Sequence, residues 1–175
     1  MSNFSELLDA QVKNEFAASQ QYAAVAVWFA SQDLPQLSRY FYRQSLEERN
    51  HAMMMVQYML DRNVPVVIPG IDPVRNDFGT AVEPIALALS QEKQVTSDIE
   101  ALFTAARSEG DPLSEQCMLW FLKEQVEEVA SMATLLNIAE RAGDNLFDLE
   151  NFVARERVGD GGRDSSAPEA AGGVL

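Results

Sequence analysis

The chain contains a single histidine, His51, three residues after Glu48 in the segment Ser45–Met55 (SLEERNHAMMM). Residues three apart share one face of a helix, so this carboxylate and this imidazole can point at a common centre. Carboxylates together with an imidazole are suitable ligands for iron or manganese. A helix can also carry an isolated histidine for no chemical reason, and the rest of the sequence has to discriminate between these two interpretations.

The same ligand spacing recurs 77 residues further along the chain. This offset pairs Glu15 with Glu92, Glu47 with Glu124, Glu48 with Gln125, and His51 with Glu128. In each half a lone acid precedes a pair of ligand-type side chains by 33 residues. A Glu-x-x-His segment alone occurs often by chance, but matched spacing in two halves favours a metal site over coincidence.

The donor types indicate which metal such a site would take. Clustered carboxylates in a low-dielectric interior repel one another and take up protons, whereas two divalent cations relieve the repulsion. Glu48 is the natural bridging ligand between two such cations. Gln125 offers only a neutral amide, which predicts a labile ligand set in the second half and suits a metal that passes through. The lack of clustered cysteine and histidine argues against structural zinc.

Four long segments with helical periodicity must position these residues. The first lacks Gly and Pro and carries apolar residues at intervals of three and four, such as Leu8 and Val12, with Ser5 as the expected cap. The predicted helices span residues 5–31, 36–61 and 82–108, then from the turn at 109–112 to 142, with a short fifth helix over 145–155.

The segment Val64–Gly79 contains three prolines and two glycines, which excludes a helix and predicts an extended crossover. Short turns join the helices on either side of it, so each pair forms an antiparallel hairpin. The predicted fold is all-α: a four-helix bundle with one long crossover between helices two and three, plus a short C-terminal helix. We expect one domain over residues 1–157 and a flexible, Gly/Ala-rich tail over 158–175.

Composition excludes several classes of function. The chain has 175 residues, 47% of them apolar, and a net charge of −14, so it can bury a core but has no basic stripe for nucleic acid or anionic membranes. The single cysteine, Cys117, rules out an internal disulfide. No secretory signal is visible, and the longest apolar run, Tyr22–Ala30, is too short to span a bilayer, so we expect a soluble cytoplasmic protein.

Four segments resemble the ferroxidase motifs of non-haem bacterial ferritins: EFAASQQY, EERNHA, LSQEK and KEQVEE. The resemblance covers residues 1 to about 155, and AERAGDNLFDLENFVARE is similar to the end of the fourth helix and the fifth helix of actinobacterial ferritins. It implies a homo-oligomeric shell of 24 subunits that oxidises Fe(II) with oxygen or hydrogen peroxide and stores the ferric mineral. By resemblance, the first iron is bound by Glu15, Glu48 and His51, and the second by Glu48, Glu92 and Glu128, with Gln125 beside them.

Two further features follow from the resemblance. Bacterial ferritins often bind a third iron, and its ligand positions match Glu47, Glu124 and Glu127, with Glu128 shared. A solvated acidic face is the competing interpretation of these three acids. Tyr22 matches a tyrosine that neighbours the di-iron site and supplies an electron or a hydrogen bond, and it lies seven residues after Glu15 on the same helix face. A core tyrosine is the alternative.

Other positions depart from related subfamilies. Bacterioferritins place a haem-binding methionine directly after the second-helix glutamate, where this chain has Arg49, and they carry a second Glu-x-x-His that this chain lacks. We therefore predict no haem and interpret Met53–Met55 as core packing. Glu115 matches an acidic position of the threefold iron channel in ferritins, but Met118 stands where many ferritins have a second acid.

Three other functions compete with iron storage. A permanent di-iron oxidoreductase of the same bundle class, such as a peroxidase, would favour a second histidine and an electron-transfer domain, and neither is present here. A non-enzymatic helical oligomer would use its acids only for solubility. A DNA-protecting mini-ferritin binds its metals between subunits, and the five-helix layout fits that class poorly.

Overall fold

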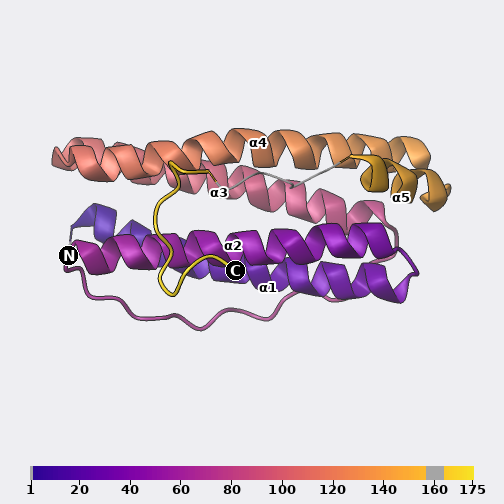
Figure 1. Ribbon diagram of the computed structural model, residues 1–175, viewed down its shortest axis with the longest axis horizontal. Helices are drawn as coiled ribbons and strands as arrows, with labels where there is room; N and C mark the ends of the chain where they lie inside the picture. Colours follow the sequence, from indigo (N-terminus) through magenta and orange to yellow (C-terminus); the bar gives the residue numbers. More distant parts are fainter. Residues whose placement is uncertain (1, 157–163) are drawn as a thin grey trace.

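The computed structural model describes residues 2–156 and 164–175, and every regular element in them is a helix. The helices are α1 (Asn3–Ser31), α2 (Pro35–Asp61), α3 (Val82–Glu109), α4 (Pro112–Ala142) and α5 (Leu146–Arg155). Figure 1 shows the four long helices side by side, with α5 at one end of the bundle. The predicted all-α bundle with a short fifth helix is confirmed.

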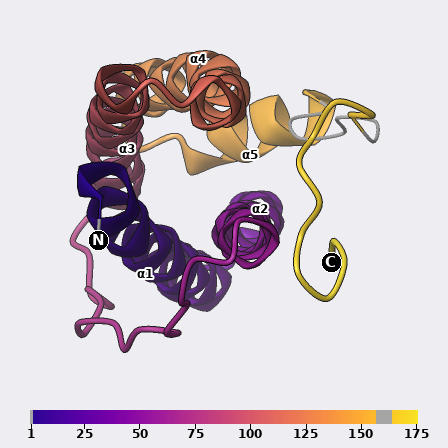
Figure 2. The same cartoon turned by 90° about the vertical axis from the view of Figure 1, so that its left-hand side faces the viewer.

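The long helices form two antiparallel hairpins, α1–α2 and α3–α4, and α1 also packs against α3 (Figure 2). Gly110 lets the chain turn between α3 and α4, because its φ of 70° lies in the left-handed region. Asp111 then caps α4 by accepting hydrogen bonds from the N–H groups of Leu113 and Ser114. The first helix begins two residues earlier than predicted, because Ser2, and not Ser5, is the residue whose side chain caps it.

The crossover between the hairpins runs extended beside α1 (Figure 1). Gln21 of α1 holds it with two hydrogen bonds, because its amide nitrogen donates to the Arg75 carbonyl at 2.8 Å and its oxygen accepts from the Arg75 N–H at 2.9 Å. Lys13 pairs with Asp72 further along. The crossover thus returns the chain along the bundle as predicted.

Two apolar clusters fill the bundle, one towards each end. Each long helix contributes to both, and its apolar stripe is interrupted by buried polar residues between the two contributions. On α1, for example, Val12 belongs to one cluster and Tyr22 to the other, with Glu15 between them. Met54 and Met55 are buried in one cluster, and Met53 packs against it, which confirms the predicted packing role of this methionine run. The helices therefore place a polar layer in mid-bundle.

The C-terminal segment 164–175 belongs to the tail expected over 158–175, whose flexibility stays a prediction. It lies beside α2 (Figure 2), where the Ala171 N–H donates to the Met53 carbonyl and the side-chain amide of Asn50 exchanges hydrogen bonds with the Leu175 backbone. The indole N–H of Trp120 donates to Asp164 at 3.2 Å. These long-range partners are invisible in the tail's own Gly-rich composition, and residues 158–163 of the prediction lie outside the described residues.

No helix in the described part of the chain combines the length and the apolar character needed to cross a membrane. The cytoplasmic location expected above stays a prediction.

We predict that deleting residues 164–175 shifts the fluorescence emission of Trp120 to longer wavelength. Trp120 is only partly buried and loses both its hydrogen bond to Asp164 and the cover of the tail. The measurement uses a Trp28→Phe background, so that Trp120 is the only emitter. An unchanged emission maximum would show that the tail does not occupy this place in solution.

Candidate metal centre

The polar layer brings Glu15, Glu48 and His51 together. All three are almost fully buried, and one ligand atom from each lies within 4.8 Å of the others. Nδ1 of His51 is 3.6 Å from Oε2 of Glu48, as the spacing of three on α2 predicts. The first half of the sequence pattern therefore forms a compact group of oxygen and nitrogen donors.

Glu92 is a buried carboxylate on α3, and two neighbouring side chains donate hydrogen bonds to it. The Tyr22 hydroxyl donates a hydrogen bond to Oε1 of Glu92. The Gln125 amide nitrogen donates to Oε2 at 3.1 Å and to the Glu92 carbonyl at 3.2 Å. Gln125 thus orients a carboxylate with its amide group, and Tyr22 is both a buried core residue and a partner of the site.

Glu128 lies on α4, where it is 8% exposed, and like Glu92 it belongs to neither group of donors within 4.8 Å of one another. Burial, together with the negative charges of Glu47, Glu92 and Glu124, raises its pKa to about 9. The carboxyl group consequently holds its proton at neutral pH unless a cation is present.

A second group of donors adjoins the first on its outer side. Glu47, His51 and Glu124 also bring one ligand atom each within 4.8 Å of one another, and the two glutamates are partly exposed. Gln44 supports Glu47 through a hydrogen bond of 2.8 Å. Glu127, in contrast, is exposed and belongs to neither compact group, which fits the alternative of a solvated acid.

Sequence reasoning missed two residues of the site, Gln11 and Gln44, and a second contact of His51. His51 belongs to both groups, although the family pattern suggested only acids for the outer one. Gln11 donates to Oε1 of Glu15 at 2.8 Å, and Gln44 donates to Glu47. Their spacings of four and three residues before these acids are the helical signals that could have revealed both glutamines.

The electrostatics of the inner group suit a cation. Burial raises the pKa of Glu15 and Glu48 well above the ordinary value, and the proximity of the Glu48 charge raises that of Glu15 further. Burial also raises the pKa of Glu92, although hydrogen bonds from Tyr22 and Gln125 oppose the shift. Oε2 of Glu15 and Oε1 of Glu48 are buried without a hydrogen-bond partner among the described residues. Buried orphan oxygens of this kind are costly unless a proton or metal satisfies them, so the residues present fit divalent metal.

Comparison with known proteins identifies the family. The family model described as "Ferritin-like domain" matches residues 5–142. The chain is a member of the ferritin family. This ferritin is 60% identical over 174 residues to Ferritin BfrB of Mycolicibacterium smegmatis and 58% identical over 174 residues to Ferritin BfrB of Mycobacterium tuberculosis. Each match covers 99% of this chain and 96% of the relative.

A more distant relative is the bacterial non-heme ferritin of Staphylococcus aureus, with 32% identity over 143 residues, 82% of this chain and 86% of the relative. Among solved structures, an open pore ferritin from Archaeoglobus fulgidus superposes with a TM-score of 0.85 at 23% identity, over 90% of this chain and 99% of that chain. At this low identity, the likeness to the Archaeoglobus fulgidus structure supports the fold alone. The predicted membership of the non-haem bacterial ferritins is confirmed, whereas the absence of haem stays a prediction.

We predict that binding of Zn(II), a redox-inert probe, to this ferritin at pH 7 releases protons. Below its pKa of about 9 the Glu128 carboxyl holds a proton that the cation must displace, and the pKa values of Glu15 and Glu48 are raised as well. Affinity should therefore rise as pH increases from about 6 to about 9.

Calorimetric titration in two buffers with different ionisation enthalpies measures the proton release directly. The Glu128→Gln variant, which has no proton to lose at this position, should release fewer protons than the parent protein. Equal apparent binding heats in both buffers would contradict this account of the site.

Proposed function

We propose that this ferritin oxidises Fe(II) at a di-iron centre inside each subunit and stores the ferric product within a hollow shell of 24 subunits. The observation that carries the proposal is the buried group of Glu15, Glu48 and His51 with two unpartnered carboxylate oxygens. Membership of the ferritin family, whose members bind and store iron, supports it. Iron is here the substrate and the cargo.

In this proposal Glu15, Glu48 and His51 bind the first Fe(II), and Glu48, Glu92 and Glu128 bind the second. Glu48 is shared, because it lies between Glu15 and the acids of the second hairpin, and the charges of both Glu92 and Glu128 act on it. Two divalent cations offset the mutual repulsion of four buried carboxylates. Protons leave these groups as the metal binds.

Two residues around Glu92 orient this carboxylate for the second iron ion. Tyr22 and Gln125 fix both of its oxygens, so little side-chain freedom remains to be lost when iron binds. Tyr22 is adjacent to this ligand and can supply an electron or a hydrogen bond during turnover. Because Gln125 is occupied in orienting Glu92, the second position relies on carboxylates alone.

The reaction has a simple balance. Each of two Fe(II) ions loses one electron to become Fe(III), and dioxygen takes up the two electrons and two protons to become hydrogen peroxide. With hydrogen peroxide as the oxidant, the same two electrons and two protons yield two molecules of water. The buried site excludes bulk solvent and holds the two substrate ions close together, which converts an encounter of three reactants into a reaction within one cavity.

The outer acids Glu47 and Glu124 provide a third iron position beside the pair, next to His51, whose neutral imidazole has one free lone pair and so binds one of these ions at a time. The partial exposure of these two acids suits ions that arrive or leave, and the exposed Glu127 stays a predicted ligand of this position. Haem has no part in the proposal.

The predicted channel residues give little support for an acidic threefold route into the shell. Met118 is fully buried within its own subunit, and Glu115 pairs with Arg107 at 3.1 Å.

We predict that Glu48→Ala and His51→Ala each lower the initial rate of Fe(II) oxidation by at least about 10-fold, because each removes a ligand of the first iron position. The rate is followed by the absorbance of the ferric product. Glu140→Ala removes an exposed acid on α4 and serves as the matched control with unchanged rate. If both site variants oxidise Fe(II) at the rate of the parent protein, the proposed iron centre is wrong and the non-enzymatic oligomer is favoured.

We predict that the purified protein is a particle of 24 chains of 19.4 kDa, about 470 kDa by light scattering, and takes up many iron atoms per subunit. Iron is counted after exposure to Fe(II) and air and removal of unbound metal. A species of dimer size that binds two iron atoms per chain and no more would favour the permanent di-iron oxidoreductase.

A further inference from the structure

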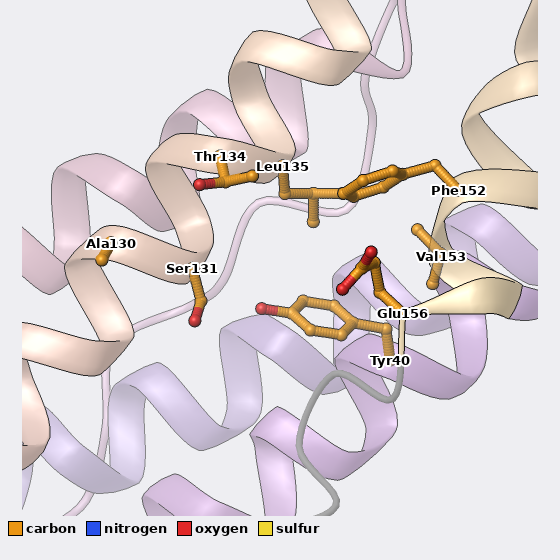
Figure 3. A pocket seen from close by; sticks show the side chains of 8 residues that line it. All are labelled: Tyr40, Ala130, Ser131, Thr134, Leu135, Phe152, Val153 and Glu156. Atoms are coloured by element: carbon orange, nitrogen blue, oxygen red, sulfur yellow. The ribbon is translucent and has the colours of Figure 1, made fainter.

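A second cavity lies away from the donor groups, where α2, α4 and α5 meet (Figure 3). Its volume is about 240 Å³. Tyr40 of α2 forms its floor, Leu135 of α4 and Phe152 of α5 form apolar walls, and Ser131 and Glu156 reach it from α4 and from the end of α5. None of these side chains is a ligand in the proposed iron centre.

Tyr40 is the most informative residue of this cavity. Its side chain is 3% exposed, yet its hydroxyl has no hydrogen-bond partner among the described residues. Figure 3 shows the hydroxyl pointing into the cavity towards Ser131. Burial raises the pKa of Tyr40, so the group stays protonated and is available as a donor. A buried hydroxyl without a partner costs free energy, and a ligand with an acceptor atom would recover it.

The size and the walls of the cavity indicate a ligand with one ring. An apolar cavity of about 150 Å³ is enough to bind benzene, whereas drug-sized ligands need roughly 300 Å³ or more. The present volume lies between these limits. Leu135 and the ring of Phe152 offer apolar contact, and the hydroxyls of Ser131 and Thr134 lie on the exposed side, where a second polar group of a ligand would meet them.

The surrounding charge excludes anions. Glu156 contributes a carboxylate to the rim. The negative charge of Glu47 also acts on the Tyr40 hydroxyl and the positive charge of Arg43 opposes it, whereas the nearby Glu128 carboxyl carries its proton at neutral pH. The chain as a whole carries a net charge of −14. A ligand that accepts a hydrogen bond from Tyr40 should therefore be uncharged.

We propose that this cavity binds a small, uncharged molecule that combines one aromatic ring with a hydroxyl group, as a phenol does. Its oxygen accepts a hydrogen bond from Tyr40 and its ring packs between Leu135 and Phe152. The hydroxyl of the ligand can in turn donate to Ser131 or to the Glu156 carboxylate. This binding site is independent of the proposed iron chemistry, because it uses none of the iron ligands.

A crystal soaked in 4-bromophenol tests the location, because the anomalous signal of bromine marks the bound molecule. We expect a bromine peak inside the cavity, near Leu135 and Phe152. Peaks confined to other parts of the assembly, or the lack of any peak, would overturn the proposal.

Ligand-observed NMR of the intact assembly with phenol and with benzoate tests the chemistry. Phenol should bind, Tyr40→Phe should weaken its binding by about 3- to 10-fold through the loss of one hydrogen bond, and benzoate should bind more weakly than phenol because it is an anion. Tyr42→Phe is the matched control, since Tyr42 is an exposed tyrosine on the same helix. Equal phenol binding by the Tyr40→Phe and Tyr42→Phe variants, or benzoate binding as tight as that of phenol, would overturn the assignment.

Discussion

The structure depends on one electrostatic constraint, the burial of several carboxylates in the middle of a helical bundle. Glu15, Glu48, Glu92 and Glu128 lie between two apolar clusters, where burial raises the pKa of each of them. Such groups destabilise a fold when they are charged and unpaired. The apolar clusters on either side hold the helices together in spite of this layer. A bound cation would offset the repulsion between the buried carboxylates.

The two hairpins meet this constraint in different ways. The first supplies the imidazole of His51 next to Glu48, whereas the second supplies Glu128 and uses Gln125 to orient Glu92. A neutral amide that donates hydrogen bonds stabilises the charged form of the neighbouring carboxylate without adding a strong ligand. The asymmetry leaves the first hairpin with oxygen and nitrogen donors and the second with carboxylate donors alone.

The faces of α2 and α4 carry further features outside the proposed iron centre. The segment 164–175 docks through Asn50 and Trp120, close to the outer donors Glu47 and Glu124, and together with them it lines a pocket beside the middle of the bundle. At the end of the bundle where α5 lies, this helix lines the cavity that contains Tyr40. Both features depend on chain segments that follow the four-helix bundle, so the C-terminal part of the chain shapes what can approach the bundle.

The sequence by itself determined the helices, the crossover and the spacing of Glu15, Glu48, His51, Glu92 and Glu128, because helical periodicity and helix breakers are local properties of the chain. The resemblance to ferritins followed from the same residues. Only the tertiary structure decided that Gln125 donates to Glu92, that His51 also meets Glu47 and Glu124, and that the tail packs on α2. Contacts of this kind depend on how side chains from different helices meet, and no periodicity along one helix specifies the partner that a neighbouring helix will present.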